Sequence, residues 1–128
     1  MEIVYAKTNA EFLNKVFGTD YKAWMKCIWE YDKDTMVWMV EFDGKARQGW
    51  VNTIVDANTV REEYIGAVAD KLVTHTRVKK YRRIVVKKER EYGRYIILGT
   101  FYYDFKNSID SNKRIWIKTA DEIIKKTK

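Results

Sequence analysis

Short stretches in which apolar residues alternate with polar ones, each bounded by turn residues, recur along most of this chain. A side-chain period of two is typical of β-strands, whereas a helix places apolar residues three and four positions apart. Turn signals come about every eight to twelve residues, without strand–helix–strand alternation. The pattern favours an α+β fold: a small, mostly antiparallel curled sheet or partial β-barrel with two or three short helices.

The expected strands follow this alternation. Asp32 to Thr35 and Asp43-Gly44 are turn signals, so the first three strands are expected to form successive hairpins. The fifth strand is apolar on both faces, as a central strand is, and joins the fourth near Glu91-Tyr92-Gly93. We expect strands over residues 24–31, 36–42, 49–55, 81–88, 95–103 and 114–118.

Helices are expected at fewer places. Thr8-Asn9-Ala10-Glu11 fits a capping box, and the apolar spacing after it predicts a short helix that ends at Gly18. Residues 58–64 are expected to form a loop and a helical turn, and residues 104–112 a polar loop. A second capping box, residues 119–122, is expected to open a terminal helix, whereas residues 67–76 fit neither pattern.

Composition bounds the class of protein. A chain of 128 residues is expected to form a single domain over residues 1–128, and 46% hydrophobic residues exclude a disordered tail. One cysteine and one histidine exclude a structural zinc site, and we expect no cofactor. The single cysteine and the absence of an N-terminal signal segment predict a cytoplasmic protein, and no apolar run is long enough to span a membrane.

The net charge of +7 is distributed unevenly. Residues 77–128 contain 16 Lys and Arg against 6 Asp and Glu, a net of +10, whereas residues 1–76 contain 9 against 12, a net of −3. A domain divided in this way presents a basic surface to an acidic partner, and DNA is the first such partner to consider, with RNA as an alternative.

The cations are densest between Arg77 and Arg94, where Tyr81 and Tyr92 are interleaved with them. This composition is typical of segments that hold a phosphate backbone and stack on bases. The alternative is an edge strand kept soluble by its cations. The candidate nucleic-acid-binding residues are Arg77, Lys79, Lys80, Arg82, Arg83, Lys87, Lys88, Arg90 and Arg94.

Two other patterns have residues of the kind found in catalytic sites. In residues 41–45 a carboxylate, one residue and a lysine follow an apolar strand, the spacing with which restriction-type nucleases hold Mg²⁺, with Asp32 or Asp34 as a further ligand. An ordinary hairpin turn explains the same residues. Cys27 and His75 could pair as nucleophile and base, but Cys27 is expected to be a buried small side chain. We therefore expect no catalytic residues and no metal.

A candidate base pocket lies around Trp50. An aromatic plane close to an amide that both donates and accepts hydrogen bonds can hold a flat heterocycle and read its edge. Trp50 and Asn52, followed by Tyr64, offer this combination, with packing of Trp50 in the core as the alternative.

The order of Phe42-Asp43-Gly44, Gly49-Trp50 and the basic hairpin 81–103 resembles the modified-base-reading modules of SRA type and their PUA-like barrel relatives, which are often attached to restriction nucleases. The resemblance covers about 60 central residues and implies that Asp43 lies near a pocket for a flipped cytosine derivative. The chain is short for the family and lacks its pocket spacing beyond the aromatic-Asp-Gly triplet.

The sequence thus predicts a non-enzymatic nucleic-acid-binding module that reads a flipped or modified base in DNA through a basic hairpin and an aromatic recess. A phage or mobile-element protein that binds and inhibits a protein partner is the first alternative, and a small Mg²⁺-dependent nuclease is the second.

Overall fold

A computed structural model describes residues 1–42, 49–64, 78 and 80–123. Within these residues, eight strands form one sheet, accompanied by two α-helices and a 3₁₀ turn. The strands are β1 Glu2–Tyr5, β2 Ile28–Glu30, β3 Thr35–Val40, β4 Trp50–Asp56, β5 Thr59–Tyr64, β6 Arg82–Glu89, β7 Arg94–Tyr103 and β8 Arg114–Ala120. The helices are α1 Asn9–Phe17 and α3 Phe105–Ser111, and the 3₁₀ turn is η1 Arg90–Tyr92.

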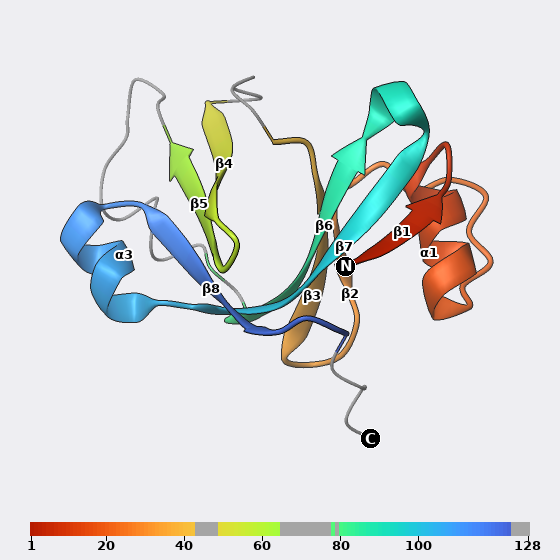
Figure 1. Ribbon diagram of the computed structural model, residues 1–128. Helices are drawn as coiled ribbons and strands as arrows, with labels where there is room; N and C mark the ends of the chain where they lie inside the picture. The colour runs from red at the N-terminus through yellow and green to blue at the C-terminus, as the bar shows by residue number, and fades with distance from the viewer. Residues whose placement is uncertain (43–48, 65–77, 79, 124–128) are drawn as a thin grey trace.

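The strand order is β2-β3-β6-β7-β8-β5-β4, and β1 pairs with β7 beside this path. All pairs are antiparallel except β3 and β6, which run parallel. The sheet curls strongly, so that β4 and β5 rise opposite β3 and β6, but it does not close (Figure 1). The expected curled, mostly antiparallel α+β architecture is confirmed.

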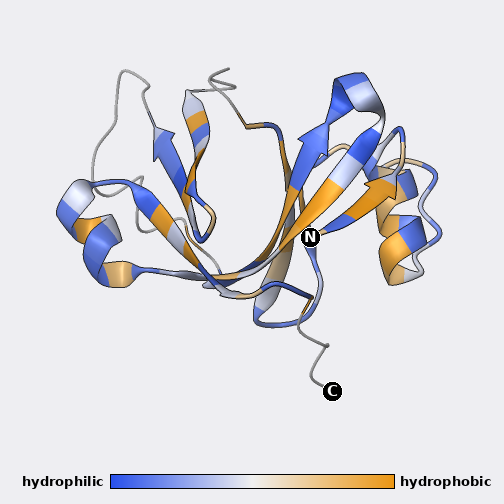
Figure 2. Ribbon diagram, viewed as in Figure 1, coloured by the Kyte–Doolittle hydropathy of each residue, from blue (hydrophilic) through white to orange (hydrophobic). Residues whose placement is uncertain are grey.

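One face of the sheet is covered by α1. Thr8 accepts a hydrogen bond from the backbone N–H of Glu11, and Gly18 ends the helix in the left-handed conformation, as the capping pattern predicts. The helix buries Phe12 and Leu13 completely. Its hydrophobic residues appear in orange in Figure 2. The core under α1 consists of Ala6, Phe12, Leu13, Val37, Met39, Ile84, Val86, Tyr95 and Ile97.

The opposite, concave face carries a second core. Because side chains of a strand alternate between the two faces, the neighbours of the first core residues point into the curl. In β6, for example, Ile84 and Val86 pack under α1, whereas Val85 packs on the concave face. The concave core consists of Trp38, Val40, Val60, Val78, Val85, Leu98, Phe101, Tyr103 and Trp116.

Two segments expected to be irregular have regular structure. Residues 59–64 form strand β5 between β4 and β8, not a helical turn, although β5 is drawn mostly in the hydrophilic colour in Figure 2. Residues 105–111 form helix α3, not a loop. Asp104 caps its N-terminus by accepting from the N–H of Asn107, and Asn112 ends it at φ 56°.

Other expectations are corrected at the strand boundaries. The strand expected over 24–31 is limited to β2, and Cys27 is exposed, not buried. The turn at residues 32–35 joins β2 to β3 as expected, but β3 pairs next with β6 and β4 pairs with β5, so β3 and β4 form no hairpin. Thr119 lies within β8 and is not a helix cap.

Candidate functional site on the concave face of the sheet

The concave face buries charge. Among the described residues, the buried charged side chains are Glu62, Arg83 and Arg114, each less than 9% exposed. Nη1 of Arg83 lies 2.8 Å from Oε1 of Glu62, and Nη1 of Arg114 lies 3.7 Å from Oε2. The indole N–H of Trp116 donates to the same Oε1 at 2.8 Å. We call Glu62, Arg83, Arg114 and Trp116 the concave cluster.

The cluster is assembled from three strands. Register places Arg114 of β8 directly beside Glu62 of β5, while Arg83 enters from β6. The guanidinium of Arg83 lies 4.1 Å from the ring centroid of Trp116 and 4.8 Å from that of Trp38. These two aromatic faces hold the guanidinium flat, and cation–π attraction offsets part of its lost hydration.

Both arginines of the cluster approach the same carboxylate. Arg83 pairs with Oε1 of Glu62 at 2.8 Å, and Arg114 lies 3.7 Å from Oε2. Nε of Arg83 is also buried without a hydrogen-bond partner among the described residues. Removing a charge from water costs several kcal/mol unless a partner compensates it. The buried Nε of Arg83 is therefore a donor that an acceptor group of a ligand could meet.

Trp50 lies half-buried at the rim of this cluster. Its ring centroid is 5.2 Å from that of Tyr64, its partner in the β4–β5 register, and the guanidinium of Arg114 lies 4.5 Å from it. Gly49 has φ +87°, and a Cβ there would come within 2.6 Å of Cε2 of Tyr64. A glycine before Trp50 thus lets the chain approach the Tyr64 ring closely.

Asn52 shares this face of β4. It stands opposite Glu62 in the register, two residues from Trp50. Its Oδ1 is buried and has no hydrogen-bond partner among the described residues. A buried acceptor without a partner is costly, and one beside an aromatic ring is a place where a ligand amino group could donate. The fold thus brings Trp50, Asn52 and Tyr64 together; Asp43 lies outside the described residues.

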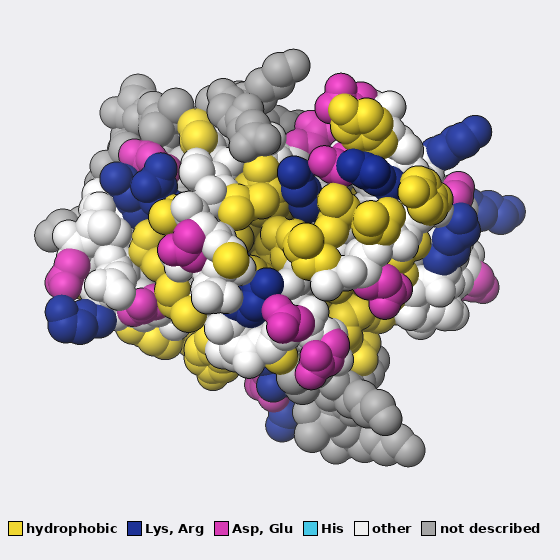
Figure 3. All heavy atoms as spheres, in the orientation of Figure 1, with side chains coloured by type: hydrophobic (Ala, Val, Ile, Leu, Met, Phe, Trp, Pro, Cys, Tyr) yellow, Lys and Arg dark blue, Asp and Glu magenta, His cyan; other side chains and the backbone are white. Residues whose placement is uncertain are grey.

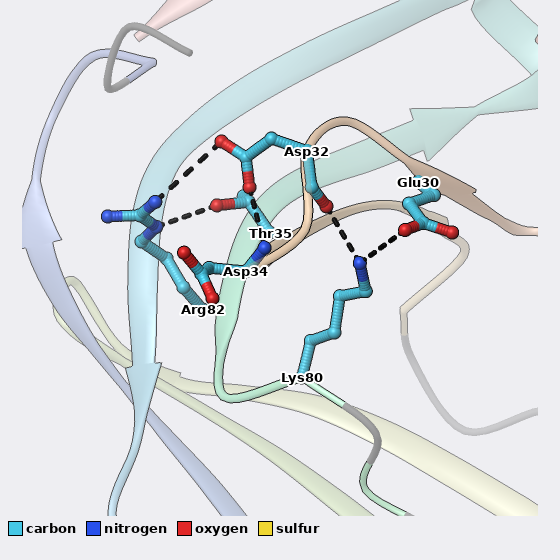
Figure 4. Close-up of polar contacts among 6 residues, drawn as sticks. All are labelled: Glu30, Asp32, Asp34, Thr35, Lys80 and Arg82. Carbon is cyan, nitrogen blue, oxygen red and sulfur yellow. Dashed lines mark hydrogen bonds and ion pairs between the residues drawn. The ribbon is translucent and has the colours of Figure 1, made fainter. Parts of the chain in front are cut away.

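The basic segment is more fully paired than its composition suggests. Figure 4 shows Lys80 and Arg82 beside the β2–β3 turn: Nζ of Lys80 lies 2.6 Å from Oε1 of Glu30, and Nε of Arg82 donates to Oγ1 of Thr35 at 2.7 Å. Arg82 also lies 3.7 Å from Oδ2 of Asp32. Arg77 and Lys79 lie outside the described residues.

The β2–β3 turn lowers the pKa of Asp32. Burial acts to raise the pKa of its carboxyl, but hydrogen bonds from Asp34 and Thr35 and the charge of Arg82 lower the pKa overall. The carboxylate therefore stays ionised and keeps neutralising Arg82 near neutral pH.

The cations at the other end of the hairpin are also paired. Lys87 and Arg94 share Glu89, Arg90 binds Glu41 at 2.7 Å, and Lys88 donates to Asn9 at 3.0 Å. Arg83 is buried in the concave cluster and so does not share a surface with Arg82. The described cations of the segment thus lie on different surfaces and do not form one continuous phosphate-binding row.

Neither catalytic pattern is assembled in the described part of the chain. His75, Asp43 and Lys45 lie outside it, so the dyad and the nuclease alternative are not tested. The described residues contain no group of three or more His, Cys, Asp or Glu placed to hold a metal ion. No helix among them is long and apolar enough to cross a membrane.

Sequence reasoning missed Glu62, Arg114, Trp38 and Trp116. Trp38 and Trp116 were visible as alternating apolar residues of strands. Glu62 was hidden because the pair Glu62-Glu63 reads as polar surface, and only the strand assignment of residues 59–64 would have turned Glu62 inward.

No protein-family model matches the sequence, and no curated protein matches it. The fold is similar to that of a solved structure titled "The 5-Hydroxymethylcytosine-Specific Restriction Enzyme AbaSI", with a TM-score of 0.66 and 22% sequence identity. The similarity covers 93% of this chain but only 38% of that chain. The protein therefore shares the fold of a part of this enzyme.

Proposed function

We propose that this protein is a DNA-binding module that reads an extruded, modified cytosine on the concave face of its sheet. Trp50 and Tyr64 would stack on the base, and the amide of Asn52 would accept from its exocyclic amino group. The buried Nε of Arg83 would donate to an acceptor group on the base or on its substituent.

The observation that carries the proposal is Oδ1 of Asn52, buried without a hydrogen-bond partner among the described residues on the same face of β4 as the half-buried Trp50. Similarity of fold to a 5-hydroxymethylcytosine-specific restriction enzyme supports the choice of base. The net charge of +7 supports DNA as the partner.

The test is a binding titration with duplexes that are identical except for one central base: cytosine, 5-methylcytosine or 5-hydroxymethylcytosine. We expect a modified base to bind more tightly than cytosine. Asn52→Ala should reduce that preference by about 1 to 3 kcal/mol, the range for a base contact. Because the variant removes an acceptor that has no partner, its free energy of unfolding should change by only about 1 kcal/mol or less.

Thr53→Ala is the matched control, since Thr53 is the next residue of β4 and points to the opposite face. It should leave both affinity and preference unchanged. Equal affinity for the three duplexes would contradict base reading, and only the proposal of DNA binding would remain. Failure of the intact protein to bind any DNA at low salt would remove the nucleic-acid function and favour a protein partner.

A further inference from the structure

A second group of aromatic side chains lies on the surface at the β6–β7 hairpin, apart from the concave cluster. Tyr92 of η1 is 59% exposed, and Tyr5 and Ile3 of β1 are 64% and 49% exposed. Large apolar side chains scattered singly on a surface are ordinary, but here two tyrosines, Tyr92 and Tyr5, lie beside one cation, Arg94.

The strand register places Tyr5 and Ile3 on the same face as Arg94. Tyr5 stands opposite Arg94, which in turn stands opposite Glu89 of β6. Two positions along, Ile3 stands opposite Ile96, which packs against the concave core. The group therefore lies on the same face of the sheet as the concave cluster.

The group is held in place before any ligand arrives. The guanidinium of Arg94 lies 4.8 Å from the ring centroid of Tyr92, and Nε of Arg94 donates to Glu89. That hydrogen bond is the main reason why the pKa of Arg94 is raised. The backbone N–H of Ala6 donates to the carbonyl of Gly93 at 3.0 Å and so ties β1 to the end of the hairpin.

The charge of the surface favours an anion. Glu89 is shared by two cations, since Lys87 lies 3.3 Å from it and Arg94 is bonded to it. The surface formed by Ile3, Tyr5, Lys87, Glu89, Tyr92 and Arg94 thus combines exposed aromatic rings with a net positive charge. Figure 3 shows hydrophobic side chains beside Lys and Arg at the upper right, where Figure 1 places η1.

We propose that this surface, the hairpin platform, stacks on an unpaired base of a single-stranded segment of DNA while its cations contact the neighbouring phosphate. Aromatic rings beside a positive charge bind single strands with little sequence preference, because every base offers a flat face. The inference rests on the proposed function. In Figure 1, η1, the start of β4 and the end of β5 reach the same rim of the curled sheet, so one DNA ligand could meet the platform and Trp50 together.

The experiment uses the full chain and a single-stranded oligonucleotide that carries 2-aminopurine, whose fluorescence falls when it stacks. The intact protein should bind it and quench the fluorescence. Tyr92→Ala should weaken binding about tenfold and abolish most of the quenching, because one stacking ring is lost. Tyr92→Phe keeps the flat face and should bind within about twofold of the intact protein.

Tyr102→Ala is the matched control, since Tyr102 is also an exposed tyrosine of this hairpin, at 48%, but belongs to β7 on the convex face. It should leave binding and quenching unchanged. If Tyr92→Ala binds and quenches like the intact protein, the proposal for the hairpin platform is wrong. It is also wrong if the intact protein binds duplex but not single-stranded DNA. Neither outcome contradicts base reading on the concave face. An intact protein that binds neither form would remove the platform and the proposed function together.

Discussion

The two faces of the sheet bury different kinds of side chain. The face under α1 buries an apolar core in which Phe12 and Tyr95 stack at 4.7 Å. Within the described residues, the concave face buries a core of similar size but adds three charged side chains and two polar atoms without a hydrogen-bond partner, Oδ1 of Asn52 and Nε of Arg83. Apolar burial stabilises a fold, whereas buried ion pairs contribute little net stability. We therefore expect the first face to dominate the stability of the fold, and the proposed ligand to bind on the second.

The largest expected effect lies under α1. Phe12→Ala removes a fully buried ring and should lower the free energy of unfolding by about 3 to 5 kcal/mol. The folded fraction should still bind DNA with unchanged affinity. Ile3→Val is the control, since Ile3 is largely exposed and should change stability by less than about 0.5 kcal/mol. Chemical denaturation measures both. A small loss in Phe12→Ala would show that this face does not dominate stability.

The concave cluster should behave in the opposite way. Replacing Glu62 and Arg114 by Leu and Arg83 by Met together removes the buried charges but keeps apolar volume. Such replacements are often neutral or stabilise by about 1 to 4 kcal/mol, so the melting temperature should be unchanged or higher. DNA binding should weaken by about 1 to 3 kcal/mol. Loss of folding in the triple variant would mean that the cluster is structural, and the contrast between the faces would fail.

Single substitution within the cluster sharpens this test. Glu62→Leu alone should be destabilising, because it leaves both guanidinium groups buried without their carboxylate. Its loss of stability should therefore be reversed when Arg83 and Arg114 are replaced as well.

The smallest effect concerns a buried hydroxyl under α1. Burial raises the pKa of Tyr95 to about 12 from its ordinary value of 10, and its O–H donates to Asn9 at 2.6 Å. Because the folded protein disfavours the ionised phenol, this contribution to stability is complete below pH 10 and is lost as the pH rises toward about 12. Tyr95→Phe should cost about 1 kcal/mol at neutral pH and lessen the alkaline loss of stability. An identical alkaline profile in the variant would exclude Tyr95 as its cause.

The sequence predicted the elements that depend on local pattern. The caps of α1 and the strands expected over residues 81–88 and 95–103 rest on local signals, and α1, β6 and β7 confirm them. The pairing of strands was not predictable in the same way. β3 resembles the first half of a hairpin with β4, but it is a central strand: its two edges pair with β2 and β6, and its two faces pack into the two cores. Nothing in residues 35–40 identifies a partner 47 positions away.

Half of the candidate site was predictable for the same reason. Trp50, Asn52 and Tyr64 share a face because they lie at even spacing on adjacent strands, although residues 59–64 were expected to include a helical turn. Glu62 remained hidden because its partners are remote: Arg83 is 21 residues away and Trp116 is 54. Tertiary contacts outweigh the poor strand propensity of adjacent glutamates.

The parallel pairing of β3 with β6 also has a consequence for how the chain folds. β3 cannot complete its ladder until β6 is available, and β1 must wait for β7, whose residue Ile97 pairs with Glu2. Contacts this distant along the chain slow folding, because loop closure precedes the gain from pairing. During synthesis the first half is therefore expected to emerge with unsatisfied strand edges, and a cut between β5 and β6 should yield two fragments that fold only when they are mixed.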